Sequence, residues 1–266
     1  MIIIKNKSEQ EKMIAVGKKL GSVFDRLALE VKPGRSTYEI SKKAEEFLRE
    51  VGCKPTFKGY SGFSGAVCTS VNDILIHGIP SKEVILKEGD ILSIDMGNVD
   101  ESGYQGDACR TYAVGSISAE AQKLIRCTEE CFFEALKACY VGRHLYEISM
   151  AIQKVADRYG YSLIRDFGGH GLGKEMHEDP FIPNYYSPEL GLGPFLRAGM
   201  VLAIEPMVMS GSSEYRTLSD GWGIQALDHK LNAHYENDVL ITEDGPRILS
   251  VDSQVKARLT DLEKQE

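Results

Sequence analysis

Residues 89–95 read GDILSID and residues 199–205 read GMVLAIE, so that glycine, leucine, isoleucine and a final carboxylate recur in register. A second pair, GRSTYEI at 34–40 and GRHLYEI at 142–148, matches at five of seven positions. The two offsets are 110 and 108 residues, and two matches at nearly one offset indicate a duplicated unit. We therefore expect a single domain over residues 1–266, built from pseudo-symmetric halves at roughly 8–115 and 116–250, with a short C-terminal tail at 252–266.

Helical and strand-like segments alternate around these repeats. Residues 8–11 have capping-box spacing and open a helical pattern that Pro33-Gly34 ends, and residues 36–39 open a second helix. Short β-rich runs occupy 67–115, helical patterns return at 118–140 and 145–159, and strand-like runs follow at 201–208, 239–242 and 248–251. Helices followed by strands, twice over, predict an α+β fold.

Both repeated strands end in a carboxylate, Asp95 or Glu205, and burying an acid there is costly unless something neutralises it. Pseudo-symmetry would bring these two acids into one cleft, and Asp107 and Glu236 follow on β-like segments without an obvious Lys or Arg partner. Divalent cations resolve the repulsion, because Mn, Fe(II), Co and Zn accept carboxylate-rich sites. Each acid alone is ordinarily a solvated carboxylate, but the joint pattern predicts a pair of metal ions.

Six histidines can supply the other common ligand type: His77, His144, His170, His177, His229 and His234. His170 is surrounded by small residues in GGHGLG, which would let a metal or substrate approach the backbone. His77 and His177 lie in turn-rich segments, whereas His144 and His229 are interpreted as structural. His234 lies two residues before Glu236 and would share its strand face, which indicates at most a supporting role.

Composition and charge exclude several classes of protein. The 266 residues carry 42% hydrophobic side chains and a net charge of −8, which disfavours a binder of the nucleic-acid backbone. No apolar run approaches the ~20 residues that span a bilayer, and the N-terminus lacks the apolar segment of a signal peptide. The six cysteines form no C-x-x-C pair, so we expect reduced thiols and a cytoplasmic protein.

One motif competes with the metal interpretation. Residues 168–174 fit the phosphate-loop pattern up to its last position, where Glu175 replaces the required Ser or Thr. A carboxylate there removes the magnesium-binding hydroxyl and repels phosphate. A nucleotide-binding protein is therefore disfavoured.

The order Asp95, Asp107, His170, Glu205, Glu236 resembles that of the dinuclear metallohydrolases with the pita-bread (creatinase/aminopeptidase) fold. Flanking motifs narrow the resemblance to the type I, bacterial methionine aminopeptidases, over about residues 8–250: SVND at 70–73, HGIP at 77–80, GGHGLG at 168–173, HEDP at 177–180, IEPM at 204–207 and DGW at 220–222. The resemblance implies a curved, mostly antiparallel sheet with helices on its outer face.

The same resemblance implies a role for each ligand and each catalytic residue. Asp95 would bind one metal ion, His170 and Glu205 the other, and Asp107 and Glu236 would bridge the two. A metal-bridging water would attack the carbonyl of the first peptide bond.

Three residues would assist this attack. Glu205 would accept the proton of the water, His177 would polarise the carbonyl, and His77 would contact the substrate amide nitrogen.

The resemblance also implies an apolar pocket for the methionine side chain, with walls formed by Tyr60, Phe63, Cys68, His77, Met176 and Trp222. Three residues depart from the family pattern: Phe57 replaces Cys, Phe63 replaces Tyr and Met176 replaces Phe. The interval from Asp95 to Asp107 is one residue longer than usual, and we expect a turn at 98–103 to absorb it.

The implied function is removal of the N-terminal methionine from nascent proteins, preferentially when the second residue is small, by a monomeric enzyme. Contact with ribosomes would require a basic patch, for which the candidates are Lys5, Lys7, Lys12, Lys18 and Lys19. A solvated helix face is the favoured explanation of that cluster. Two other functions stay open, namely cleavage before proline by another pita-bread hydrolase and binding without catalysis.

Overall fold

The computed structural model describes residues 1–264. Its helices are α1 (Lys7–Leu27), α2 (Thr37–Glu50), α3 (Ala119–Leu136), α4 (Tyr146–Tyr159) and α5 (Ser253–Glu263), with short 3₁₀ turns at Ala28–Glu30, Tyr60–Gly62 and Pro188–Leu190. Its strands are β1 (Lys54–Pro55), β2 (Cys68–Val71), β3 (Ile74–Ile76), β4 (Ile91–Val99), β5 (Gln105–Ala113), β6 (Ser162–Leu163), β7 (Gly168–Gly171), β8 (Glu178–Pro183), β9 (Val201–Ile204), β10 (Met207–Met209), β11 (Tyr215–Thr217), β12 (Ile224–Ala226), β13 (Asn232–His234), β14 (Glu236–Thr242) and β15 (Gly245–Ile248).

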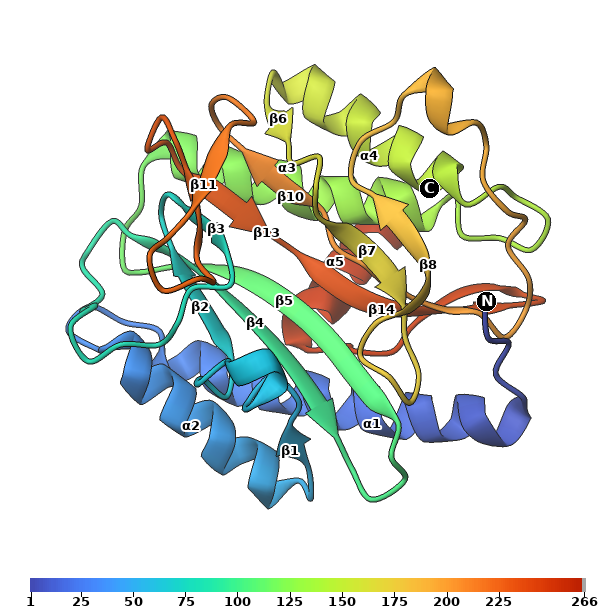
Figure 1. Ribbon diagram of the computed structural model, residues 1–266, viewed down its shortest axis with the longest axis horizontal. Coiled ribbons are helices and arrows are strands. Elements are labelled where there is room, and N and C mark those ends of the chain that lie inside the picture. Colours follow the sequence, from blue (N-terminus) through green and yellow to red (C-terminus); the bar gives the residue numbers. More distant parts are fainter. Residues whose placement is uncertain (265–266) are drawn as a thin grey trace.

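One nine-stranded sheet joins the two parts of the sequence. Its strand order is β1-β4-β5-β14-β9-β7-β8, with β2 added to β4 and β15 to β14, and these pairings are antiparallel. Strands β4 and β5 from the first half therefore lie beside β14 and β9 from the second (Figure 1). Two further three-stranded sheets have the orders β13-β10-β6 and β11-β12-β3.

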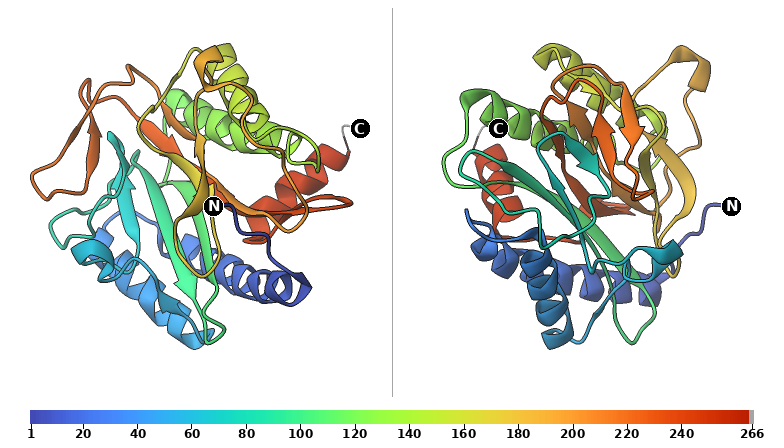
Figure 2. Two further views of the ribbon diagram at one scale, coloured as in Figure 1. Left: turned by 45° about the vertical axis from the view of Figure 1, so that its right-hand side comes forward. Right: turned by 60° about the vertical axis from the view of Figure 1, so that its left-hand side comes forward.

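Two helix pairs cover the strands. Helices α1 and α2 (blue) lie along the lower part of the molecule in Figure 1 and α3 and α4 (green) along its upper part, and Figure 2 shows the same arrangement from two further directions. Each pair has its own hydrophobic cluster: Leu20 and Phe24 of α1 pack with strand residues such as Ile94, and Phe132 of α3 packs with strand residues such as Val239. These clusters fix the sheet from outside and leave its other face for the site.

The predicted α+β class and the mostly antiparallel sheet are confirmed. The helix start at residues 8–11 was placed too late, because Asn6 caps α1 and forms the capping box with Glu9. The predicted start of the second helix at residues 36–39 is confirmed, and Ser36 and Glu39 form a capping box there. The division into pseudo-symmetric halves stays a prediction.

Several strand lengths differ from those expected. Strands β4 and β5 form a long hairpin that stays paired to Val99 and Gln105, so the connecting turn lies at residues 100–104 and not at the expected 98–103. The run at 201–208 is broken between Ile204 and Met207, where Glu205 and Pro206 leave the ladder. This break separates Glu205 from the regular hydrogen bonding of β9.

All six cysteines are free, in agreement with the expected reduced thiols, and all six are buried. Within residues 1–264, no helix is both long and apolar enough to cross a membrane.

Candidate active site

Adjacent strands of the nine-stranded sheet carry the predicted acids side by side. Cys109 of β5 lies opposite Asp95 of β4 on one side and opposite Glu236 of β14 on the other. Asp107 lies two residues before Cys109 and therefore shares its face of the sheet. Glu205 follows β9, the strand that pairs with β14 on its other edge. The antiparallel register thus gathers four acids that are far apart in the sequence.

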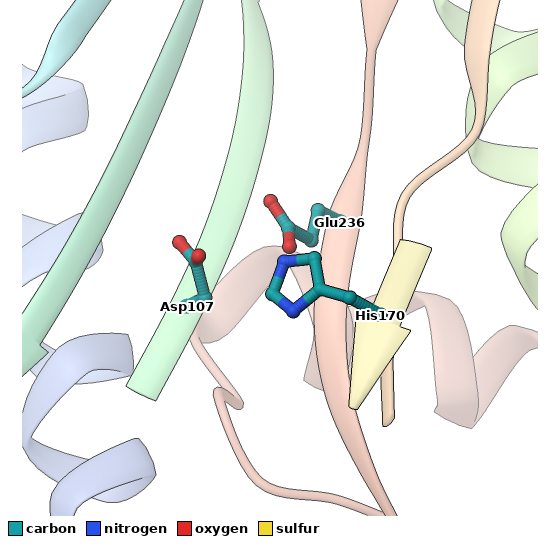
Figure 3. A group of neighbouring side chains, drawn as sticks. All are labelled: Asp107, His170 and Glu236. Carbon is teal, nitrogen blue, oxygen red and sulfur yellow. The ribbon is translucent and has the colours of Figure 1, made fainter. Parts of the chain in front are cut away.

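Donor atoms of Asp107, His170 and Glu236 all lie within 4.8 Å of one another, and so do those of Glu205, His234 and Glu236. Figure 3 shows the first three side chains facing the space between β5, β14 and β7. His170 Nε2 lies 3.7 Å from Glu205 Oε1, which links the two groups. The spacing is that of ligand atoms that surround cations.

The donor chemistry fits divalent cations. Asp107, Glu205 and Glu236 are at most 9% exposed, and Oδ1 of Asp95 and Oδ1 of Asp107 have no hydrogen-bond partner among the described residues. Burial raises the pKa of Asp107 to about 7, and burial followed by repulsion from neighbouring acids raises the pKa of Glu205 and Glu236 well above their usual range. Cations bound at this point would remove that penalty.

His170 is held on β7 in the orientation of a ligand. Its Nδ1 donates to the Gly171 carbonyl at 2.9 Å, which leaves Nε2 free to face Glu205. Burial lowers the pKa of His170 to about 4, so the ring is neutral. The glycines beside His170 allow close approach of neighbouring backbone and not of a ligand, because a Cβ on Gly169 would lie 2.3 Å from the Ala203 carbonyl oxygen. Residues Gly168–Gly171 form a strand, which excludes the phosphate loop.

A cavity of about 480 Å³ opens above the carboxylates. Every site residue singled out from the sequence lines it: Tyr60, Phe63, Cys68, His77, Asp95, Asp107, His170, Met176, His177, Glu205, Trp222 and Glu236. Phe57, Phe167, Phe181 and Met207, of which only Phe57 was noted from the sequence, also line the cavity. The structure thus brings all the predicted residues together, while their individual roles stay predictions.

Aromatic contacts shape one end of the cavity. The Phe63 and Trp222 rings meet edge to face with centroids 5.1 Å apart, and His77 contacts Trp222 and Phe167 in the same manner. His77 adopts a left-handed backbone conformation, with φ of 60°, that β-branched or bulky residues seldom take. Burial lowers the pKa of His77 to about 4, so this ring is also neutral.

His177 lies at the mouth of the cavity on an exposed turn. Its Nδ1 is 3.3 Å from the Tyr60 hydroxyl, and its ring centroid is 4.4 Å from that of His170. The next residue, Glu178, pairs with the buried ammonium of Lys5. This ion pair anchors the turn that carries His177 to the N-terminal segment.

Sequence reasoning missed a buried polar group behind the carboxylates. Arg110 is fully buried and donates to Asp252 Oδ2 at 2.8 Å and to the Glu236 carbonyl at 2.6 Å. Asp238 accepts a hydrogen bond of 2.7 Å from the backbone N–H of Asp107. The only sequence signal was a charged residue within an apolar strand, which does not identify a distant partner.

Comparison with known proteins gives the family. Residues 11–243 match the model of metallopeptidase family M24. The chain is 49% identical over 251 residues to a methionine aminopeptidase of Clostridium acetobutylicum, covering 94% of this chain and 99% of that protein. The structure of a methionine aminopeptidase from Thermotoga maritima superposes with a TM-score of 0.91 at 42% identity, covering 95% of this chain and 100% of that one.

A more distant likeness marks the breadth of the family. A prolidase from Pyrococcus furiosus matches with a TM-score of 0.76 at 25% identity, and only 66% of that longer chain is covered. The resemblance found in the sequence, including its pita-bread fold, is confirmed. The chain belongs to metallopeptidase family M24, and the relatives whose own length it covers almost completely are methionine aminopeptidases.

Proposed function

We propose that this protein is a metal-dependent aminopeptidase that removes N-terminal methionine from polypeptides. The observation that carries the proposal is a buried carboxylate and histidine cluster at the base of a cavity with apolar sides. The cluster supplies groups for peptide hydrolysis, and the cavity beside it is lined by apolar and aromatic side chains. Relatives of nearly equal length that are named methionine aminopeptidase support the same conclusion.

The proposed centre holds two divalent ions. Asp95 would bind one, His170 and Glu205 the other, and Asp107 and Glu236 would be shared. When bound, such ions lower the pKa of a coordinated water and polarise a carbonyl. Mn, Fe(II), Co and Zn all tolerate this set of oxygen and nitrogen donors, so the proposal leaves the metal open.

Three residues of the chain would act on the substrate. Glu205 would accept the proton of the attacking water, because its carboxylate lies beside His170 at the base of the cavity. His177, at the mouth, would donate to the carbonyl oxygen as negative charge develops there. His77, which lines the cavity opposite Trp222, would contact the amide nitrogen of the scissile bond.

Apolar side chains would select methionine. Phe63, Cys68 and Met176 are at most 5% exposed, whereas Tyr60 is 48% exposed at the rim. Buried aromatic rings and sulfur atoms suit a thioether, which gains contact energy beside aromatic edges. The preference for a small second residue is part of the proposal and is tested by comparing Met-Ala-Ser with Met-Leu-Ser.

The proposed partners are the N-termini of nascent chains, met by a monomer in the cytoplasm. Contact with ribosomes stays a prediction, and one of its basic candidates is removed. Lys5 is 3% exposed and pairs with Glu178, so it does not contribute to a basic surface.

The decisive experiment measures methionine release from a Met-Ala-Ser peptide before chelation, after chelation, and after Mn or Fe(II) is restored anaerobically. We expect activity to vanish with the chelator and return with metal. Cleavage of Xaa-Pro peptides in place of Met-Ala-Ser would identify the prolidase type of activity. A folded, metal-bound protein without activity on either peptide would indicate a binding protein.

A further inference from the structure

We propose that His234 is a positioning residue that orients the Glu205 carboxylate through its Nε2–H. The inference rests on the proposed function, in which Glu205 accepts the proton of the attacking water. His234 does not line the cavity, so it would act on the reaction only through Glu205.

The position of the ring carries the argument. His234 ends β13 and is 2% exposed, one residue away from the start of β14 at Glu236. Its Nε2 lies 3.5 Å from Glu205 Oε2 and 3.9 Å from Glu236 Oε2. Neither ring nitrogen has a hydrogen-bond partner within residues 1–264. Two carboxylate oxygens thus converge on one buried nitrogen.

Electrostatics limits whether Nε2 of His234 carries a proton or a lone pair. A lone pair on Nε2 would face two oxygens that carry negative charge, and in a buried site that repulsion is poorly screened. When bound cations keep both carboxylates ionised, the contact becomes attractive only if Nε2 carries a proton or if a cation lies between the three atoms. A shift of Glu205 by a few tenths of an ångström brings Oε2 into ordinary hydrogen-bond range of Nε2.

A comparison with His170 favours a proton, and not a metal ion, on Nε2 of His234. His170 has the arrangement typical of a metal-binding histidine, with Nδ1 donating to the Gly171 carbonyl and Nε2 free. His234 has no such acceptor at Nδ1. A metal on its Nε2 would therefore bury an N–H without a partner, whereas a proton on Nε2 leaves Nδ1 as an unpaired acceptor. Buried acceptors are left unpaired more often than buried N–H donors.

The two oxygens of Glu205 are then divided between two histidines. Oε1 faces His170 at 3.7 Å, on the side of the proposed ligands, and Oε2 faces His234 at 3.5 Å. A hydrogen bond at Oε2 would fix the rotation of the carboxylate and keep Oε1 directed at the cavity. Because Glu205 leaves the ladder of β9, its side chain depends on such a contact more than the acids within strands do.

The experiment compares His234→Gln with His234→Leu. A glutamine can place an amide N–H near the position of Nε2, so it retains a donor to Glu205 but is a poor replacement for an imidazole ligand. Leucine fills the volume without a donor. We expect His234→Leu to lower kcat ten- to a hundredfold with KM changed less than about twofold, and His234→Gln to restore kcat to within about fivefold of wild type. His144→Gln, a histidine substitution away from the cavity, is the matched control.

Two measurements on metal binding do not depend on activity. Calorimetric titration of the metal-free proteins with Mn should give affinities within about threefold of wild type for His234→Gln. The visible absorption spectrum of the Co(II) protein should be unchanged in that variant. Thermal denaturation verifies that all variants fold.

Three outcomes would overturn the proposal. A tenfold loss of Mn affinity with an altered Co(II) spectrum in His234→Gln would make His234 a ligand. An unchanged kcat in His234→Leu would show that His234 does not position Glu205. An equal loss of kcat in both variants, with metal affinity retained, would show that the ring contributes only packing. Wild-type protein that binds metal but releases no methionine would overturn the proposed function instead, which keeps the two failures distinct.

Discussion

The base and the side of the cavity are built in different ways. We call the base the floor, and it consists of Asp95, Asp107, His170, Glu205 and Glu236. We call the side the wall, and it consists of Tyr60, Phe63, Cys68, His77, Met176, His177 and Trp222. Four of the five floor residues lie on strands of the nine-stranded sheet, whereas every wall residue except Cys68, the first residue of β2, lies outside the strands. Rigid neighbours fix the floor, and connecting segments form the wall.

This difference indicates that the floor serves catalysis and the wall serves substrate selectivity. Ligand atoms must be held to within a few tenths of an ångström, which paired strands achieve and loops do not. A pocket for a flexible thioether needs apolar area more than exact placement. We therefore expect floor substitutions to abolish metal binding and turnover together, and wall substitutions to change turnover or selectivity while the metals stay bound.

The largest effect is expected for Asp107→Asn. The substitution removes a negative charge from the centre of the floor, where Oδ1 has no other partner among the described residues. We expect kcat/KM to fall by about a thousandfold or more, and metal content per chain to fall with it. Elemental analysis and peptide assays measure both quantities. Asp157→Asn on the exposed face of α4 is the control, and full metal content with full activity in Asp107→Asn would contradict the distinction.

His177→Ala should give the next largest effect. Removing a donor to the developing oxyanion lowers kcat by about a hundredfold. Because His177 belongs to the wall, metal content should equal that of wild type. Loss of metal in this variant would show that His177 is a metal ligand and would contradict the division between floor and wall.

Trp222→Ala is expected to lower kcat/KM for Met-Ala-Ser by about tenfold. It removes the ring that meets Phe63 at 5.1 Å and so opens one side of the pocket. Discrimination between methionine and bulkier first residues should weaken at the same time, as competition assays with Leu-Ala-Ser would detect. An unchanged preference would place the selective contacts elsewhere in the wall.

The smallest effect concerns the pH dependence of stability in the metal-free protein. Folded Asp107 has a pKa of about 7, whereas an unfolded aspartate has one of about 3.9. Between these values the folded state binds more protons, so this stabilisation is complete below pH 4 and is lost as the pH rises through 7. We expect the melting temperature of chelated protein to fall by a few degrees between pH 5 and 8.

Variants of the floor and of the wall should differ in how steeply the melting temperature of the chelated protein falls with pH. Asp107→Asn, which has no carboxyl to titrate, should show a shallower fall with pH, and Trp222→Ala the same fall as wild type. Added metal should abolish much of the fall, because cations favour the ionised carboxylates. Equal slopes for all three chelated proteins would show that the floor does not carry the effect.

The sequence predicts the floor better than the wall. Asp95 and Glu205 stand out because each follows an apolar run in a repeated motif, although Asp95 lies within β4 and only Glu205 follows the end of its strand. Antiparallel pairing then places Asp107 and Glu236 nearby. Nothing in the local pattern links Tyr60 to His177, which are 117 residues apart, and only family resemblance brought them into one pocket. Phe167, Phe181 and Met207 were missed because an apolar residue at a cavity looks like an apolar residue in a core.

The misplaced start of α1 and the limited role predicted for His234 also have physical causes. Both Asn6 and Ser8 can cap a helix, and only the paired Glu9 decides between them. His234 was given a supporting role from strand periodicity, but the approach of Glu205 to its ring depends on the break after β9. Tertiary position, rather than local propensity, decides such cases.

The buried pair of Arg110 and Asp252 has a consequence for the order in which the protein is made. The two residues are 142 positions apart, so the guanidinium is synthesised long before its carboxylate partner. Burying that cation without Asp252 costs about 3–5 kcal/mol, and the same cation also holds the backbone of Glu236. A growing chain therefore cannot close β5 onto β14 stably until Asp252 has been added. If the protein trims other chains during their synthesis, its own ability to do so arises only after Asp252 has been synthesised.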